Sequence, residues 1–225
     1  MNIKIALFDF DGTLIDSNEA IIQSLNKVAI AHRQTAFNEK ELNEILGKPI
    51  QEQMKLLSGD DEALNAQLVE GYRIAYRAVQ DELTTIFDGI EEMLIHIKAL
   101  GIKTGIVSNK GRHGIKHGMR MFELDPYIDV VISLDDVIVP KPHEEGIYKA
   151  LELLGIPQEQ MAEVLKETLF AGDSGHDIET AKNAGCYSVL VDWTIIDKNQ
   201  LLALKPDFIA KTPKDIELLI TTGKI

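Results

Sequence analysis

The stretch at residues 3–14 constrains the fold more than any other, because an apolar run ends there in two carboxylates and a glycine. Residues 3–8 are typical of a strand buried on both faces, as in a parallel sheet. Asp9 therefore falls where that strand ends, the usual place for a ligand site in an open parallel sheet. Side chains of a strand alternate, so Asp9 and Asp11 would leave on the same side, and Gly12 would let the backbone approach an anion. Taken alone, these residues would more often form an Asx turn that closes a strand than a ligand site.

The chain is long enough for one sizeable domain, or for a domain with an insert, since it has 225 residues of which 45% are hydrophobic. It shows neither an apolar run of membrane-spanning length nor a signal peptide, so we expect a cytoplasmic protein with no membrane partner. The net charge of -13 argues against a nucleic-acid partner. An anionic ligand would need a local source of positive charge, which a divalent cation and placed lysines could supply.

Residues 15–84 show a helical pattern throughout, without the alternation of a strand. Apolar residues at helical spacing predict three or four amphipathic helices, and the break at Gly47-Lys48-Pro49 separates two of them. We therefore expect residues 15–84 to form an inserted all-helical domain. Residues 1–14 and 85–225 would form the main domain.

Strands and helices alternate from residue 85 onward. Apolar runs predict strands at residues 102–107, 129–134, 168–171 and 187–191, separated by residues at helical spacing. Thr212-Pro213-Lys214-Asp215 is typical of a capping box that opens a last helix. This alternation predicts an α/β fold with a doubly wound, Rossmann-like parallel sheet.

Polar side chains lie just past the carboxyl ends of the predicted strands, or one loop later. They are Asp9, Asp11, Ser108, Asn109, Lys141, Asp173 and Asp177. Because these strand ends share one edge of a parallel sheet, we expect the side chains to meet in one crevice. The set suits phosphoryl transfer, with carboxylates to hold Mg²⁺, and Lys141 and Ser108 to bind phosphate. One carboxylate could attack phosphorus, and a second could protonate the leaving oxygen and then activate water.

Four segments resemble, in order, the four motifs of the haloacid dehalogenase superfamily. They are residues 9–17, Val107-Ser108-Asn109, Lys141-Pro142 and residues 172–177. The helical insert directly after the first motif resembles that of the subclass with a helical cap, as in phosphoglycolate phosphatases. The resemblance implies a Mg²⁺-dependent phosphatase that hydrolyses a small phosphorylated metabolite through an aspartyl phosphate. We expect a monomer or a weak homodimer.

The resemblance also assigns roles, residue by residue. It makes Asp9 the nucleophile and Asp11 the general acid and base. The metal residues would be Asp9, Asp11 through its backbone carbonyl, and Asp173, with Asp177 supporting them. Ser108 and Lys141 would grip the phosphate. From their positions at the strand ends, Gly12 and Asn109 are predicted to bind the substrate.

Two other functions remain open at this point. One is a phosphosugar mutase of the same superfamily, and the other is a non-catalytic, regulatory phospho-acceptor protein. The intact set of Asp9, Asp11, Ser108, Lys141 and Asp173 favours an enzyme. Lys48 lies in a break between cap helices and is a candidate to bind the carboxylate or second phosphate of a substrate, although an exposed lysine is the alternative.

Overall fold

The computed structural model describes residues 2–223 and divides the chain into two compact units. The core unit contains the residues up to Ile15 together with those from Ile86 onward, and the helical unit is Asp16–Thr85. The two chain segments that connect the units carry the short strands β2 (Ile15–Asp16) and β3 (Thr85–Ile86), which pair with each other. Between residues 2 and 223, no helix is long and apolar enough to cross a membrane.

The core unit is built on a parallel sheet of six strands, in the order β5-β4-β1-β6-β7-β8. The strands are β1 (Ile5–Phe8), β4 (Lys103–Val107), β5 (Val130–Ile132), β6 (Thr168–Gly172), β7 (Tyr187–Val191) and β8 (Phe208–Ala210). The chain runs from β1 outward to β5 and then returns to β6 on the other side of β1. The strand order therefore reverses between β1 and β6, which is where doubly wound sheets bind ligands.

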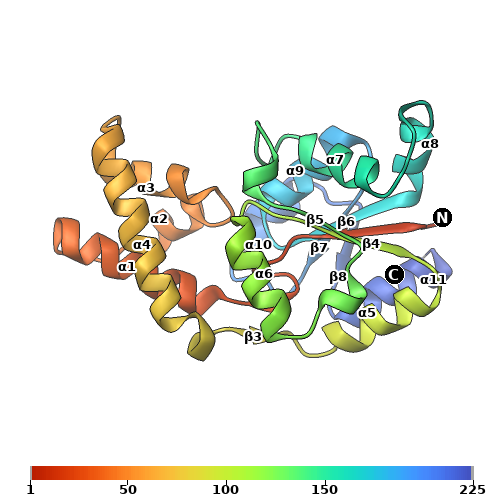
Figure 1. Cartoon of the computed structure of the whole chain (residues 1–225), viewed down its shortest axis with the longest axis horizontal. Helices are drawn as coiled ribbons and strands as arrows, with labels where there is room; N and C mark the ends of the chain where they lie inside the picture. Colours follow the sequence, from red (N-terminus) through yellow and green to blue (C-terminus); the bar gives the residue numbers. More distant parts are fainter. Residues whose placement is uncertain (1, 224–225) are drawn as a thin grey trace. The chain divides into compact units, whose positions relative to one another are not determined.

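Helices cover both faces of this sheet, with α5 and α11 on one side and α7 and α9 on the other (Figure 1). The helices of the core unit are α5 (Ile90–Ala99), α6 (Arg112–Met121), α7 (Glu145–Leu153), α8 (Met161–Val164), α9 (Gly175–Ala184), α10 (Lys198–Ala203) and α11 (Pro213–Thr222). Ala6 and Phe8 of β1 pack in the layer of α5, α6 and α11, whereas Ile5 and Leu7 pack in the layer of α7 and α9. The predicted doubly wound α/β fold, with its central strand buried on both faces, is confirmed.

Two strands differ from the predicted pattern, whereas helix α6 agrees with it. The third strand is shorter than residues 129–134, because Ser133 starts a 3-10 turn at Leu134–Asp136 through a capping box. Strand β8 was not predicted, since its three residues carry no recognisable alternation. Helix α6 is continuous despite three glycines in and before it, and at Gly118 an added Cβ would lie 2.8 Å from the Phe10 ring, so close packing explains that glycine.

The helical unit contains α1 (Asn18–Arg33), α2 (Glu39–Ile45), α3 (Ile50–Ser58) and α4 (Glu62–Leu83). Its own apolar cluster includes Leu25, Met54 and Leu68, from three of these helices. The break between α2 and α3 occurs where expected, at a glycine with φ of +81° followed by Lys48 and Pro49. This unit therefore has a hydrophobic core of its own.

Candidate active site

Three buried carboxylates meet at the point where the strand order reverses. Asp9 directly follows β1 and Asp173 directly follows β6, and these strands are neighbours in the sheet. The Asp9 backbone N–H donates to the Ala171 carbonyl at 2.9 Å, so the two strands stay paired up to the site. Asp177 lies in the first turn of α9. Each of the three aspartates offers an oxygen within 4.8 Å of the others.

Lys141 lies among these carboxylates and is itself buried. Its Nζ is 3.0 Å from Asp9 Oδ1 and 2.6 Å from Asp177 Oδ1. Burial by itself would lower the Lys141 pKa, but the charges of Asp177 and Asp9 outweigh it and raise the pKa above its usual range. The side chain is therefore a charged ammonium at neutral pH, placed between two acidic groups.

Asn109 holds the backbone of Lys141 from the end of β4. The Lys141 N–H donates to Asn109 Oδ1 at 3.0 Å, and Asn109 Nδ2 donates to the Lys141 carbonyl at 3.2 Å. Ser108, next to Asn109, is buried and hydrogen-bonds to the Asp9 side chain. The segment Ser108-Asn109 thus positions both the carboxylate of Asp9 and the ammonium of Lys141.

The three carboxylates carry more negative charge than Lys141 balances. Burial raises the Asp9 pKa from 3.8 to about 6, although Lys141, the Ser108 hydroxyl and the Phe10 N–H all favour the ionised form. Burial, reinforced by the charges of Asp177 and Asp9, also raises the Asp173 pKa well above its usual range. A bound divalent cation would remove this imbalance, and carboxylate oxygens are the ligands that Mg²⁺ prefers. The donor set therefore fits Mg²⁺.

Two local devices hold these acidic groups in place. Asp177 Oδ2 accepts from the Ser174 N–H at 3.0 Å and from the Ser174 hydroxyl at 2.6 Å, which leaves Oδ1 for Lys141. Gly12 has φ of +74°, and an added Cβ would lie 2.4 Å from Asp173 Oδ2. Glycine is the residue that permits both this backbone conformation and this close approach.

Asp11 has a different cation beside it, although only one residue separates it from Asp9. Its carboxylate oxygens lie 2.8 and 2.9 Å from Lys110 Nζ, and its side chain is 20% exposed. Lys110 was not among the site residues predicted from the sequence. Its position directly after Asn109, at the carboxyl end of β4, is the signal that would have identified it.

Lys48 belongs to the helical unit, where it lies in the break between α2 and α3 and is partly buried. Its carbonyl accepts a hydrogen bond from Gln53 Nε2 at 2.7 Å, which fixes the backbone of the break. The contact of Lys48 with a substrate remains a prediction.

Known proteins resemble this chain over nearly its whole length. The family model described as haloacid dehalogenase-like hydrolase matches residues 6–191. Pyrophosphatase PpaX of Bacillus cereus (strain AH820) is 34% identical over 216 residues, which cover 96% of this chain and 95% of that protein. A Caldanaerobacter subterraneus protein assigned to PpaX is 36% identical over 208 residues, covering 92% and 90%. Among solved structures, a Bacteroides fragilis protein assigned to the haloacid dehalogenase-like hydrolases has a TM-score of 0.85 at 28% identity, covering 96% and 100%.

Proposed function

Since this chain belongs to the haloacid dehalogenase-like hydrolase family and is a phosphatase, we propose that it hydrolyses a small phosphorylated metabolite with the help of Mg²⁺. The observation that supports this best is that two carboxylates within three residues contact different lysines. Asp9 lies against Lys141 and the other buried carboxylates, whereas Asp11 lies beside Lys110. The relatives named pyrophosphatase PpaX make pyrophosphate the first substrate to test.

Asp9 is the proposed nucleophile. One of its carboxylate oxygens forms a bond to phosphorus while the bond between phosphorus and the leaving-group oxygen breaks. Asp11, in its protonated form, gives its proton to that oxygen. Lys141 and Ser108, which already contact the Asp9 side chain, would bind the oxygens of the transferring phosphoryl group.

Water completes the reaction in a second step. The Asp11 carboxylate takes a proton from a water molecule whose oxygen bonds to phosphorus. The bond between phosphorus and Asp9 then breaks, which releases inorganic phosphate and restores the Asp9 carboxylate and protonated Asp11. One residue thus serves first as the acid and then as the base.

Asp9, Asp173 and the backbone carbonyl of Asp11 are the proposed Mg²⁺ ligands. Asp177 supports them indirectly, because its two oxygens are engaged by Lys141 and Ser174. When bound, the ion supplies positive charge that offsets the charge of the phosphoryl group. Asn109 is proposed to act on the substrate through Lys141, whose backbone it holds from both sides.

Phosphate release from an aryl phosphate and from pyrophosphate tests this proposal. We expect excess chelator to abolish release and added Mg²⁺ to restore it. We expect intact-mass analysis to detect a phosphoryl adduct on the wild type and none on Asp9→Asn. The Asp11→Asn variant should keep the adduct but turn over about 10² to 10⁴ times more slowly. Full activity in chelator, or an adduct on Asp9→Asn, would contradict the proposal.

A further inference from the structure

Lys110 contacts Asp11 but has no role in the reaction proposed above. It follows Asn109 at the end of β4 and precedes the first turn of α6. Its Nζ lies 2.8 and 2.9 Å from the oxygens of Asp11, and the Lys110 and Asp11 side chains are 14% and 20% exposed. Because both groups are largely withdrawn from water, their charges interact more strongly than those of an exposed surface pair.

Gly114 makes room for the Lys110 side chain. An added Cβ at position 114 would lie 2.7 Å from Lys110 Cε and 3.3 Å from Cδ, so the aliphatic part of Lys110 runs across the first turn of α6. Glycine is unfavourable inside a helix, where alanine is the best residue. Alanine at this position would therefore push the flexible end of Lys110 away from its path toward Asp11.

The two lysines of the site would face different parts of the substrate: Lys141 the phosphoryl group and Lys110 the leaving group. Lys141 is enclosed by Asp9 and Asp177, where the phosphoryl group would bind. Asp11 must come within about 3 Å of the leaving oxygen to give it a proton. Lys110 Nζ lies 2.8 Å from Asp11, which puts it within about 6 Å of that oxygen. An anionic group one or two bonds further along the leaving group is then within reach of the Lys110 ammonium.

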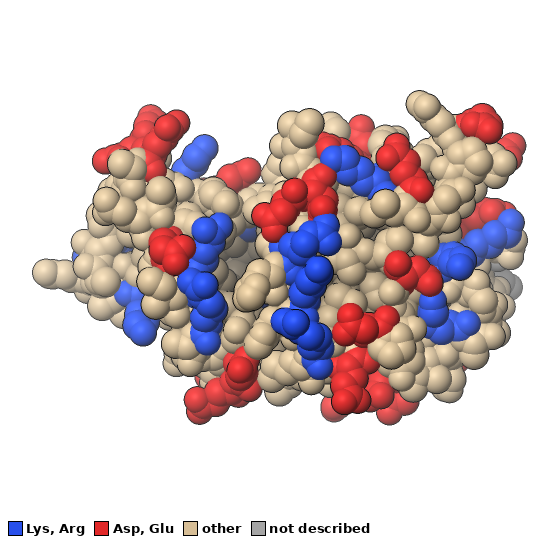
Figure 2. Space-filling model, viewed as in Figure 1, with Lys and Arg blue, Asp and Glu red and all other residues tan. Residues whose placement is uncertain are grey.

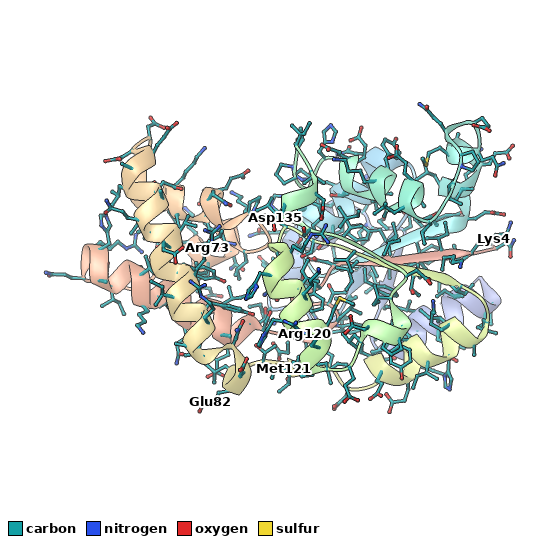
Figure 3. The ribbon with its side chains drawn as sticks, in the orientation of Figure 1. Lys4, Arg73, Glu82, Arg120, Met121 and Asp135 are labelled. Atoms are coloured by element: carbon teal, nitrogen blue, oxygen red, sulfur yellow. The ribbon has the colours of Figure 1, made fainter. Side chains whose placement is uncertain are left out.

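The helix that follows Lys110 carries further basic residues, of which Arg112 at its start is paired with Asp136. Lysine and arginine side chains form a stripe along α6 (Figure 2), and the helix contains neither Asp nor Glu from Arg112 to Met121. Figure 3 shows Asp135 beside the start of α6 and Arg120 toward its other end. In a chain of net charge -13, such a stripe lowers the repulsion that an anion meets on its approach.

We propose that Lys110 selects substrates whose leaving group is an anion. Examples are phosphate, released from pyrophosphate, and glycolate, whose carboxylate is one carbon away from the leaving oxygen. The inference rests on the proposed function, because it requires Asp11 to face the leaving oxygen. An ammonium beside Asp11 stabilises the negative charge of such a leaving group and favours its departure. Gly114 maintains the selectivity by leaving space for the lysine.

A pair of esters isolates this effect. Phosphoglycolate and 2-hydroxyethyl phosphate present the same phosphoryl group, but the leaving group carries a carboxylate in the first and a neutral hydroxymethyl group in the second. The quantity to compare is the ratio of their kcat/KM values, measured with Mg²⁺ on the full chain. A change that only misplaces Asp11 lowers both values and leaves the ratio as it was.

Lys110→Met removes the charge and keeps a side chain of similar length over Gly114. We expect it to lower the ratio about tenfold or more, the effect of losing one partly buried charge contact. Lys110→Arg should retain most of the ratio. Lys103→Met removes an exposed lysine from the amino end of β4, away from the basic stripe on α6, and serves as the control, with no expected change in the ratio.

Gly114→Ala provides an independent test, because the helix and the selectivity should respond in opposite directions. Alanine favours the helix, so we expect Tm to stay the same or rise, while the displaced lysine lowers the ratio. Two results would overturn this inference without affecting the proposed function. One is a fall of both kcat/KM values by equal factors in Lys110→Met, and the other is an unchanged ratio in Gly114→Ala. If the wild type released phosphate from neither ester nor pyrophosphate, the proposed function would fail and the inference with it.

Discussion

Asp9→Asn is expected to stabilise the metal-free protein while it removes the proposed nucleophile. Asp9 is buried, and its carboxylate lies close to those of Asp173 and Asp177. Asparagine has nearly the same shape and keeps an oxygen that can accept from the Phe10 N–H and from Lys141 Nζ. The substitution therefore removes a charge that burial disfavours and preserves most of the contacts around it.

The size of the effect follows from the pKa of this carboxyl group, which burial raises from 3.8 to about 6. Each tenfold change in proton affinity corresponds to about 1.4 kcal/mol, so the ionised carboxylate costs about 3 kcal/mol. The folded protein binds this proton more tightly than the unfolded chain, so stability is lost as the pH rises from about 4 through about 6. Above pH about 6, the ionised Asp9 carboxylate lowers the free energy of unfolding by the full amount of about 3 kcal/mol. Asp9→Asn should avoid this loss, which corresponds to a rise in Tm of about 6 to 12 °C.

Thermal unfolding in excess chelator at pH 4, 6 and 8 measures this difference. We expect Asp9→Asn to match the wild type near pH 4 and to exceed it at pH 8. Asp60→Asn, which removes an exposed carboxylate of the helical unit, is the control and should change Tm little at any pH. Added Mg²⁺ should raise Tm more in the wild type than in Asp9→Asn, because the variant lacks one proposed ligand.

Two results would refute this reasoning. Equal Tm values of Asp9→Asn and the wild type at pH 8 without metal would show that the ionised carboxylate is not destabilising. A stabilisation of the same size at pH 4 and pH 8 would show that the effect does not come from the charge, because Asp9 is protonated at pH 4 in the folded protein.

Four further predictions concern single residues. Lys141→Met leaves buried carboxylates without their ammonium and should lower the free energy of unfolding by about 3 to 5 kcal/mol in urea titrations. Gly12→Ala should cost at least about 1 kcal/mol in the same assay and weaken Mg²⁺ binding in metal titrations, because its Cβ would displace Asp173. Lys48→Ala should raise KM about tenfold for pyrophosphate but little for an aryl phosphate, and equal effects on both would argue for a surface role. Burial raises the Cys186 pKa to about 12, so the thiol should react with a disulfide reagent only after denaturation.

Much of the fold could be predicted because it depends on local patterns. The apolar run before Asp9 and the alternation of strands and helices after residue 85 indicate a parallel sheet, and the edge shared by its strand ends brings distant polar residues together. The capping box at Thr212 and Asp215 could also be predicted, because the residues that form it lie within four positions of the chain. Strand β8 was not predicted, because three residues are too few to show the alternation of apolar and polar residues that marks a strand.

The tertiary structure alone decided how the acidic and basic groups are paired. Strand alternation predicts the same direction for Asp9 and Asp11, but it does not predict which lysine each carboxylate contacts. Asp9 joins Lys141, whereas Asp11 lies against Lys110, a residue 99 positions away in the chain. The reason is physical: a charge interaction depends on distance and burial, and both are set by the strand order and by how closely α6 packs.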